Sequence, residues 1–159
     1  MITLQRRFNP IFNTFLQLKN IIGKIYSIEW KYTMNIDRLD EWWGSDKSIA
    51  WWWALIDMGY HSIDLLIWYF WLPDMITGMK STWNRKDQIY DVEDSVSFSF
   101  EYNSNTDNNI MWNFMISRVY PKKEEKIIVY WSNWIIEVQK WSIKRFDIKG
   151  ELIESLTRE

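Results

Sequence analysis

The chain has 159 residues, 47% of them apolar and 25% charged, which suits one globular domain with its own core. A net charge of −2 excludes the basic surface that nucleic-acid binding requires. The absence of cysteine excludes disulfides and thiolate metal sites and is consistent with a cytoplasmic protein. No apolar run approaches the roughly 20 residues that cross a membrane, so we expect no membrane partner.

The first part of the chain predicts a short strand, a helix and a longer strand. Residues 2–7 are expected to form a strand or the end of one. Apolar residues at helical spacing predict a helix over residues 10–22, and Gly23 follows as a C-terminal cap. Strict alternation over residues 24–34 predicts the longer strand.

The remainder predicts a loop, a second helix and a series of strands. Residues 35–53 show no clear period and are expected to form a long loop, which in compact domains often has a function. The apolar run over 54–70 predicts a helix that Pro73 closes. The expected strands are 75–83, 94–102, 110–119, 125–131, 134–139 and 142–148.

Strands that follow one another without helices between them are expected to pair antiparallel. The predicted fold class is therefore α+β, with a largely antiparallel open sheet and helices packed on one face. Apolar side chains fall on both faces of several strands. We therefore expect the other face to pack on a second copy, giving a homo-oligomer through the sheet face.

The single histidine of the chain, His61, lies in the second predicted helix between two acidic residues. Asp57 precedes it by four positions, so both side chains can share one helix face. An imidazole oriented by a carboxylate is a suitable general base near neutral pH. The competing interpretation is a structural hydrogen bond, and Asp64 is better explained as a structural partner. No second histidine or cysteine is present to build a metal site.

Segment 54–68 reads Ala-Leu-Ile-Asp-Met-Gly-Tyr-His-Ser-Ile-Asp-Leu-Leu-Ile-Trp. It resembles the helix of the Gfo/Idh/MocA oxidoreductases, which carries Asp-x-Gly-x-His-x-x-Asp-Leu. Segments 5–10, 22–28 and 92–96 also resemble that family and occur in the expected order. The resemblance covers almost the whole chain.

The resemblance implies the substrate-binding half of an NAD- or NADP-dependent dehydrogenase that oxidises a hydroxyl of a sugar, cyclitol or nucleotide sugar. It implies that His61 is the general base and that Asp57 orients it and contacts substrate. Arg38 is a candidate substrate contact, with a plain surface arginine as the alternative, while Arg6 and Arg7 lie near the expected domain junction. A non-catalytic ligand-binding or assembly module of the same fold is the alternative function.

Two departures from the family pattern stand out. The five glycines form no G-x-G-x-x-G motif, so we expect one domain over 1–159, without the nucleotide-binding half and truncated at both ends.

Tryptophan is also in excess, with 13 residues against 5 glycines, and several stand where the family has glycine. In Tyr130–Trp134 we expect a tight turn that requires positive φ. One hypothesis is that these positions have UGA codons, which some bacterial lineages read as glycine and another genetic code reads as tryptophan. UGG codons at positions 52, 53, 131 and 134 would refute it. The tryptophans in question are Trp51, Trp52, Trp53, Trp71, Trp83, Trp112, Trp131, Trp134 and Trp141.

Overall fold

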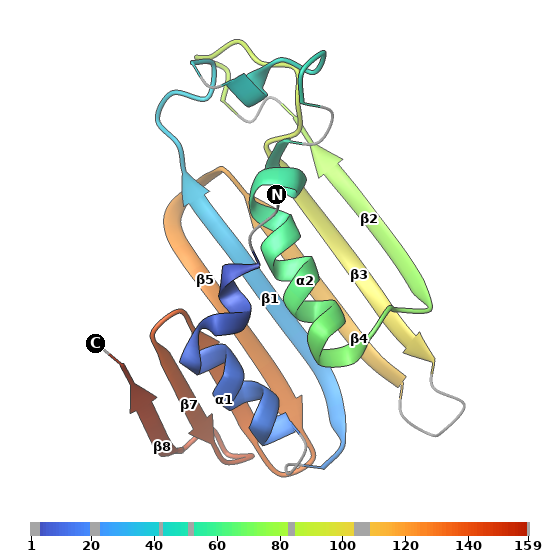
Figure 1. Ribbon diagram of the computed structural model, residues 1–159, viewed down its shortest axis with the longest axis vertical. Coiled ribbons are helices and arrows are strands. Elements are labelled where there is room, and N and C mark those ends of the chain that lie inside the picture. The colour runs from blue at the N-terminus through green and yellow to red at the C-terminus, as the bar shows by residue number, and fades with distance from the viewer. Residues whose placement is uncertain are drawn as a thin grey trace.

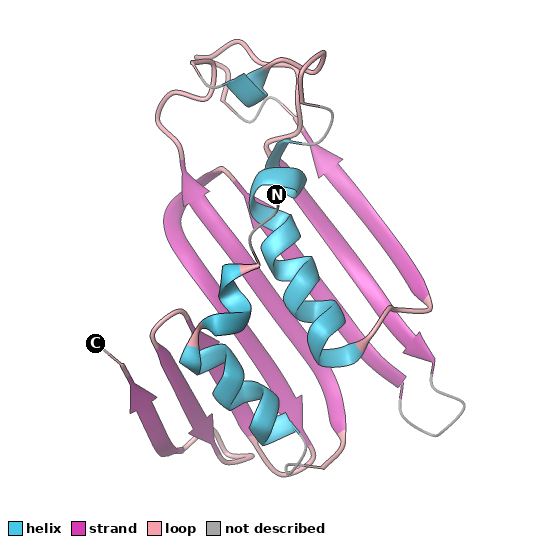
Figure 2. Ribbon diagram, viewed as in Figure 1, coloured by secondary structure: helices cyan, strands magenta, loops and turns pink. Residues whose placement is uncertain are grey.

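The computed structural model describes residues 4–19, 23–41, 43–50, 53–82, 85–103 and 109–158. These residues form an eight-stranded sheet with two principal helices on one of its faces (Figure 1). Helices, strands and loops are distinguished in Figure 2. The predicted α+β class is confirmed.

The element bounds follow the predictions closely in the middle of the chain. The helical elements are η1 (Gln5–Phe8), α1 (Pro10–Lys19), η2 (Trp43–Ser45), the π-helical turn η3 (Leu55–Gly59) and α2 (Tyr60–Phe70). The strands are β1 (Ile25–Asn35), β2 (Met75–Ser81), β3 (Ser95–Asn103), β4 (Asn109–Ser117), β5 (Val119–Trp131), β6 (Ile135–Gln139), β7 (Ser142–Phe146) and β8 (Leu152–Thr157).

The N-terminal strand prediction is wrong, because Gln5–Phe8 form a 3₁₀ helix. The side chain of Asn9 explains this outcome, since its Oδ1 accepts the backbone N–H of Ile11 at 2.9 Å and caps α1. The chain must turn into that cap, and the Asn9 backbone N–H meets the Arg6 carbonyl at 3.0 Å. Local capping therefore overrides a weak alternation.

The strand order is β2-β3-β4-β1-β5-β6-β7-β8, and neighbouring strands pair antiparallel except β1 and β4. The parallel β1–β4 register runs from Ser27 opposite Met111 to Thr33 opposite Ser117. The sequence did not predict this pair, because the two strands are separated along the chain by α2 and two strands. Strand β8 was also not predicted.

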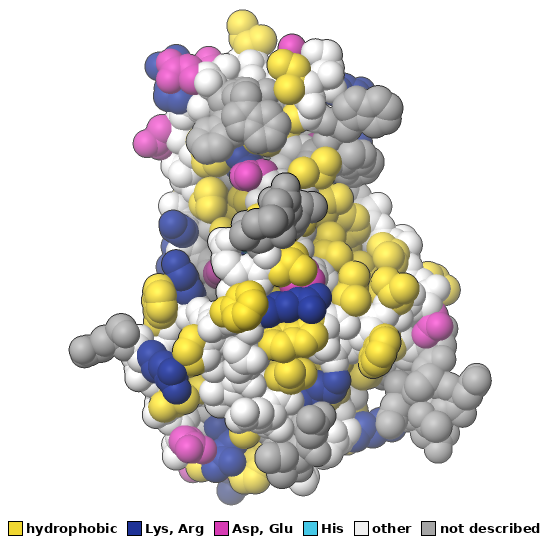
Figure 3. Space-filling view, viewed as in Figure 1, with side chains coloured by type: hydrophobic (Ala, Val, Ile, Leu, Met, Phe, Trp, Pro, Cys, Tyr) yellow, Lys and Arg dark blue, Asp and Glu magenta, His cyan; other side chains and the backbone are white. Residues whose placement is uncertain are grey.

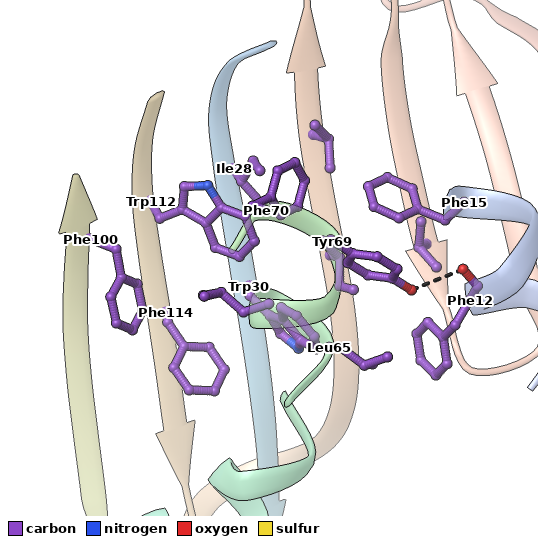
Figure 4. Packing of buried hydrophobic residues seen from close by; sticks show 14 of the residues in the cluster. Phe12, Phe15, Ile28, Trp30, Leu65, Tyr69, Phe70, Phe100, Trp112 and Phe114 are labelled. Atoms are coloured by element: carbon purple, nitrogen blue, oxygen red, sulfur yellow. Dashed lines mark hydrogen bonds between the residues drawn. The ribbon is translucent and has the colours of Figure 1, made fainter. Parts of the chain in front are cut away.

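Both helices pack their apolar side chains against the same face of the sheet (Figure 4). The ring of Phe70 in α2 meets that of Trp112 in β4 edge-on, with 4.8 Å between ring centroids. The buried Tyr69 hydroxyl donates to the Phe12 carbonyl at 3.0 Å and joins α2 to α1. A hydrogen bond satisfies a hydroxyl that would otherwise be costly to bury.

The opposite face of the central strands carries more polar side chains. Glu29 of β1 lies between Asn113 of β4 and Ile128 of β5 in the strand register. A shallow pocket of about 260 Å³ there includes Glu29, Asn113 and Ile128 in its lining. Oligomerisation through this face stays a prediction.

The tryptophan predictions have mixed outcomes. Trp71 has φ 67° and ψ −167°, a region that is essentially restricted to glycine, and it is the one non-glycine residue with positive φ in the described ranges. The expectation for Trp131 and Trp134 is wrong, since neither has positive φ. Trp131 instead ends β5 with a buried side chain, and its N–H donates to the Trp134 carbonyl at 2.9 Å.

The remaining tryptophans in question differ in their surroundings. Trp53 and Trp112 are buried, whereas Trp141 is exposed. Trp51, Trp52 and Trp83 lie outside the described residues.

Candidate active site

His61 lies in the first turn of α2, directly after the π-helical turn η3. Such turns occur frequently at functional sites. Gly59 lets this turn approach the sheet closely, because a Cβ there would lie 2.6 Å from Ile116 Cδ1 of β4. A glycine of the predicted motif therefore allows the backbone just before His61 to lie close to the sheet.

A buried carboxylate from another part of the chain fixes the beginning of this helical segment. Glu93, which lies two positions before the start of β3, accepts the backbone N–H of Leu55 at 3.2 Å through Oε1. Burial raises the pKa of Glu93, while backbone N–H groups of residues 53–55 oppose that rise. An acceptor at a helix N-terminus satisfies N–H groups that lack partners within the helix. The sequence analysis missed this role.

His61 has an uncharged imidazole at neutral pH. Its Nδ1 is buried and makes no hydrogen bond within the described residues. Burial, and secondly the positive charge of Arg6, lower the pKa of His61 to about 4, whereas Asp64 acts in the opposite direction. A neutral imidazole can accept a proton or a hydrogen bond at its unprotonated ring nitrogen.

Asp57 forms an ion pair with Arg118. No hydrogen bond between Asp57 and His61 occurs among the described side chains, although the two residues lie one turn apart as expected. The Arg118 side chain is fully buried, and burial lowers its pKa to about 10. Its guanidinium also lies over the Trp53 ring, 4.0 Å from the centroid. The sequence offered no signal for Arg118, which is 61 residues away from Asp57.

The two arginines near the N-terminus contact the same end of α2. Arg7 donates from Nε and Nη2 to the two carboxylate oxygens of Asp64, and its Nε lies 2.8 Å from Asp64 Oδ2. Arg6 pairs with Glu125 of β5, and its NH1 donates to Ser62 Oγ at 3.3 Å. Asp64 therefore has a structural partner, as expected, and both arginines tie η1 to the helix that carries His61.

A cavity of about 740 Å³ opens beside His61. The residues that line it come from η1, α1, β1, α2 and the strands β5 to β8. Its volume lies within the range of roughly 300–1,000 Å³ that small-molecule sites occupy. Lining residues that matter below are Arg6, Tyr32, His61, Lys123, Glu125 and Lys140.

Arg38 is located apart from this cavity. It belongs to the loop after β1, and its side chain is 62% exposed and pairs with Asp40 and Glu41. It is not among the described residues that line the His61 cavity. Asp57 and Arg118 are not among these lining residues either, although Asp57 precedes His61 by one helical turn.

The described residues contain no group of three histidine or acidic side chains that could hold a metal ion. No helix within the same ranges is long and apolar enough to cross a membrane.

Comparison with known proteins identifies the fold. The model of the GFO/IDH/MocA C-terminal domain matches residues 18–137. No curated protein matches the chain.

Solved structures match nearly the whole chain at low sequence identity. An aldose–aldose oxidoreductase from Caulobacter crescentus, complexed with glycerol, has a TM-score of 0.78 at 18% identity, over 100% of this chain and 47% of its own. A levoglucosan dehydrogenase with NADH and levoglucosan has a TM-score of 0.73 at 16% identity, over 97% and 45%.

A UDP-N-acetylglucosamine 3-dehydrogenase from Acidithiobacillus ferrooxidans has a TM-score of 0.69 at 14% identity, over 98% of this chain and 46% of its own. This chain thus spans less than half the length of each of these three proteins.

Proposed function

The chain belongs to the GFO/IDH/MocA family as a C-terminal domain, and from this premise we propose that it is the substrate-binding half of an NAD- or NADP-dependent dehydrogenase. The substrate would be a sugar, cyclitol or nucleotide sugar, and one of its hydroxyl groups would be oxidised. The observation that carries the proposal is a neutral imidazole at the wall of a ligand-sized cavity.

The residues present do not fit a complete dinucleotide site. The five glycines lie at positions 23, 44, 59, 78 and 150, so none forms the glycine-rich loop that cradles a pyrophosphate. Neighbours in structure include an oxidoreductase described as NAD-binding and a dehydrogenase with bound NADH. A nicotinamide, if held outside these residues, would supply the hydride acceptor.

The chain's own contribution is to hold the hydroxyl and receive its proton. His61 is proposed to accept the proton through a ring nitrogen, since the neutral form predominates at pH 7. Asp57 is proposed to accept a hydrogen bond from a neighbouring substrate hydroxyl, because its side chain remains 41% exposed despite the pair with Arg118. Asp64 favours the protonated imidazole and so eases the transfer.

One observation favours the alternative of a non-catalytic ligand-binding module. A histidine whose pKa is about 4 is a weak base at neutral pH, and Asp57 is paired with Arg118 rather than His61. General bases work best when their pKa lies near the operating pH. Under this alternative, the cavity binds sugars without turnover.

The test measures reduction of NAD⁺ and NADP⁺ by the protein together with a nucleotide-binding domain, with a panel of aldoses, cyclitols and nucleotide sugars. The variant His61→Asn is expected to lower kcat by about 10²–10⁴-fold while the Kd for substrate changes little. Tyr60→Phe, a change at the adjacent position of α2, is the matched control. Full turnover in His61→Asn would show that His61 is not the base, and sugar binding without any turnover in the wild type would favour the alternative.

A further inference from the structure

We propose that the cavity beside His61 binds an anionic group of the substrate through Lys123 and Lys140, and so selects hydroxy compounds that carry a carboxylate or a phosphate. The inference rests on the proposed function in one respect, because it takes this cavity as the substrate site.

Both lysines lie close to one carboxylate in the cavity wall. Lys123 precedes Glu125 by two positions in β5, so their side chains emerge on the same face of the strand. Lys140 occupies the turn between β6 and β7, and its carbonyl accepts a hydrogen bond from Asn9 Nδ2 at 3.1 Å. Burial raises the pKa of Glu125, and the charges of Arg6, Lys140 and Lys123 act in the opposite direction.

The positive charge of this wall is only partly compensated. Glu125 is committed to Arg6. Glu124, the other acidic residue of the lining, pairs with Lys31 at 3.2 Å. Lys123 and Lys140 form no ion pair with any residue in the described ranges. Lysine side chains with no counterion attract an anion into the cavity.

Further lysines add to this local field. Lys122 and Lys144 also line the cavity. Several basic side chains follow the edge of the helical face on the side of α1, β7 and β8 (Figure 3). This concentration contrasts with the net charge of −2 of the whole chain.

The strand arrangement provides space for the anion. Lys126 of β5 is paired with Gln139, the last residue of β6. The part of β5 that precedes Lys126 therefore has no partner in β6. The resulting notch lies between the β6–β7 turn, which carries Lys140, and the start of α1. Asn9 and Phe12 contribute the helical side of the lining.

An anion in this cavity would act directly on His61. Burial and Arg6 hold the pKa of that ring at about 4, and Asp64 is the acidic group that opposes them. A bound negative charge would favour the protonated imidazole and raise its pKa toward the ordinary value of about 6.5. Substrate binding would thereby improve the base that the proposed reaction needs.

The experiment uses His61, the single histidine among the 159 residues, as an NMR probe of the protein. Its pKa and the Kd are measured with glucuronate, glucose 1-phosphate and uncharged glucose as separate probes. We expect both anionic sugars to bind at least about tenfold more tightly than glucose and to raise the His61 pKa. The tighter of the two anions identifies carboxylate or phosphate as the preferred group.

The double variant Lys123→Gln/Lys140→Gln is expected to lose this roughly tenfold preference while glucose binding is unchanged. Lys149→Gln, a change at an exposed lysine between β7 and β8, is the matched control. Equal binding of glucose, no binding of either anion, or an unchanged preference in the double variant would overturn the proposal.

The two proposals fail in different measurements. Anion preference is read from binding alone and requires no turnover. Full turnover in His61→Asn would contradict the role of His61 as the base while leaving the lysine contacts intact. Equal binding of glucose and the two anionic sugars by the wild type, with normal turnover, would contradict the lysine contacts alone.

Discussion

The two ends of the segment from Leu55 to Trp71 are held by different interactions. At the beginning, charged residues from distant parts of the chain bind it, with Arg118 on Asp57 and Glu93 on the Leu55 N–H. At the end, Tyr69 and Phe70 pack in the aromatic core. The beginning depends on a few directional contacts, whereas the end depends on burial of apolar area, which is non-directional.

The difference concerns function as well as packing. A site needs polar groups held at fixed positions, and such groups must be paired when they are buried. The beginning of the segment meets this need, and His61, which follows it directly, lines the cavity. The end of the segment has no comparable group, so we expect substitutions there to change stability and leave ligand binding intact.

The largest effect is expected at the aromatic end. Phe70→Ala should lower the free energy of unfolding by about 3–5 kcal/mol, because a large ring that packs 4.8 Å from the Trp112 centroid is removed. Urea unfolding measures this loss, and anion binding at the His61 cavity should not change at low temperature. Leu72→Ala, at a side chain that is 73% exposed, is the control. Similar losses in both variants would contradict the assigned core.

A smaller effect is expected at the charged end. Asp57→Asn should lower the free energy of unfolding by about 2 kcal/mol, since it removes the carboxylate that faces the buried Arg118 guanidinium. The value is below that of fully buried pairs because Asp57 is 41% exposed. Asp64→Asn is the matched control and should cost about 1 kcal/mol or less, because its partner Arg7 is 35% exposed. The reverse order in urea unfolding would show that the Arg118 pair is not the stronger one.

The same contrast explains what the sequence could predict. The apolar spacing of residues 54–70 predicted a helix there, and the family motif placed Asp57 and His61 on it. Arg118 and Glu93 could not be predicted, because pairing across 61 and 38 positions depends on the sheet order. The parallel β1–β4 pair that creates this order also has no local signal. Local periodicity thus predicts elements, while the partners of buried charges follow from topology.

His61 links stability to pH at the charged end. Its folded pKa of about 4 lies below the ordinary value of 6.5, so the unfolded chain binds more protons between these values. The stability that this residue contributes is therefore present above about pH 6.5 and decreases as the pH falls toward about 4. His61→Gln should unfold with less pH dependence than the wild type between about pH 7 and about pH 5. Parallel stability curves for the two proteins would contradict the assigned burial of the ring.

The smallest effect, an increase in stability, is expected at Trp71, just after the aromatic end. Its φ of 67° and ψ of −167° are nearly restricted to glycine, and such backbone strain costs about 1–3 kcal/mol. The side chain is 82% exposed, so its removal sacrifices little burial. The N–H bond to the Ile67 carbonyl and the bond from the Tyr102 hydroxyl involve the backbone and persist in glycine.

Trp71→Gly should therefore raise the free energy of unfolding by about 1 kcal/mol and Tm by about 2–4 °C. Trp141→Gly is the control, because Trp141 is also exposed but has no positive φ, and added chain flexibility should make that variant slightly less stable. A rise in both variants would indicate that removing an exposed ring stabilises the protein whatever the backbone conformation. A rise in Trp71→Gly alone would show that the strained backbone conformation of residue 71 lowers the stability of this end of the segment.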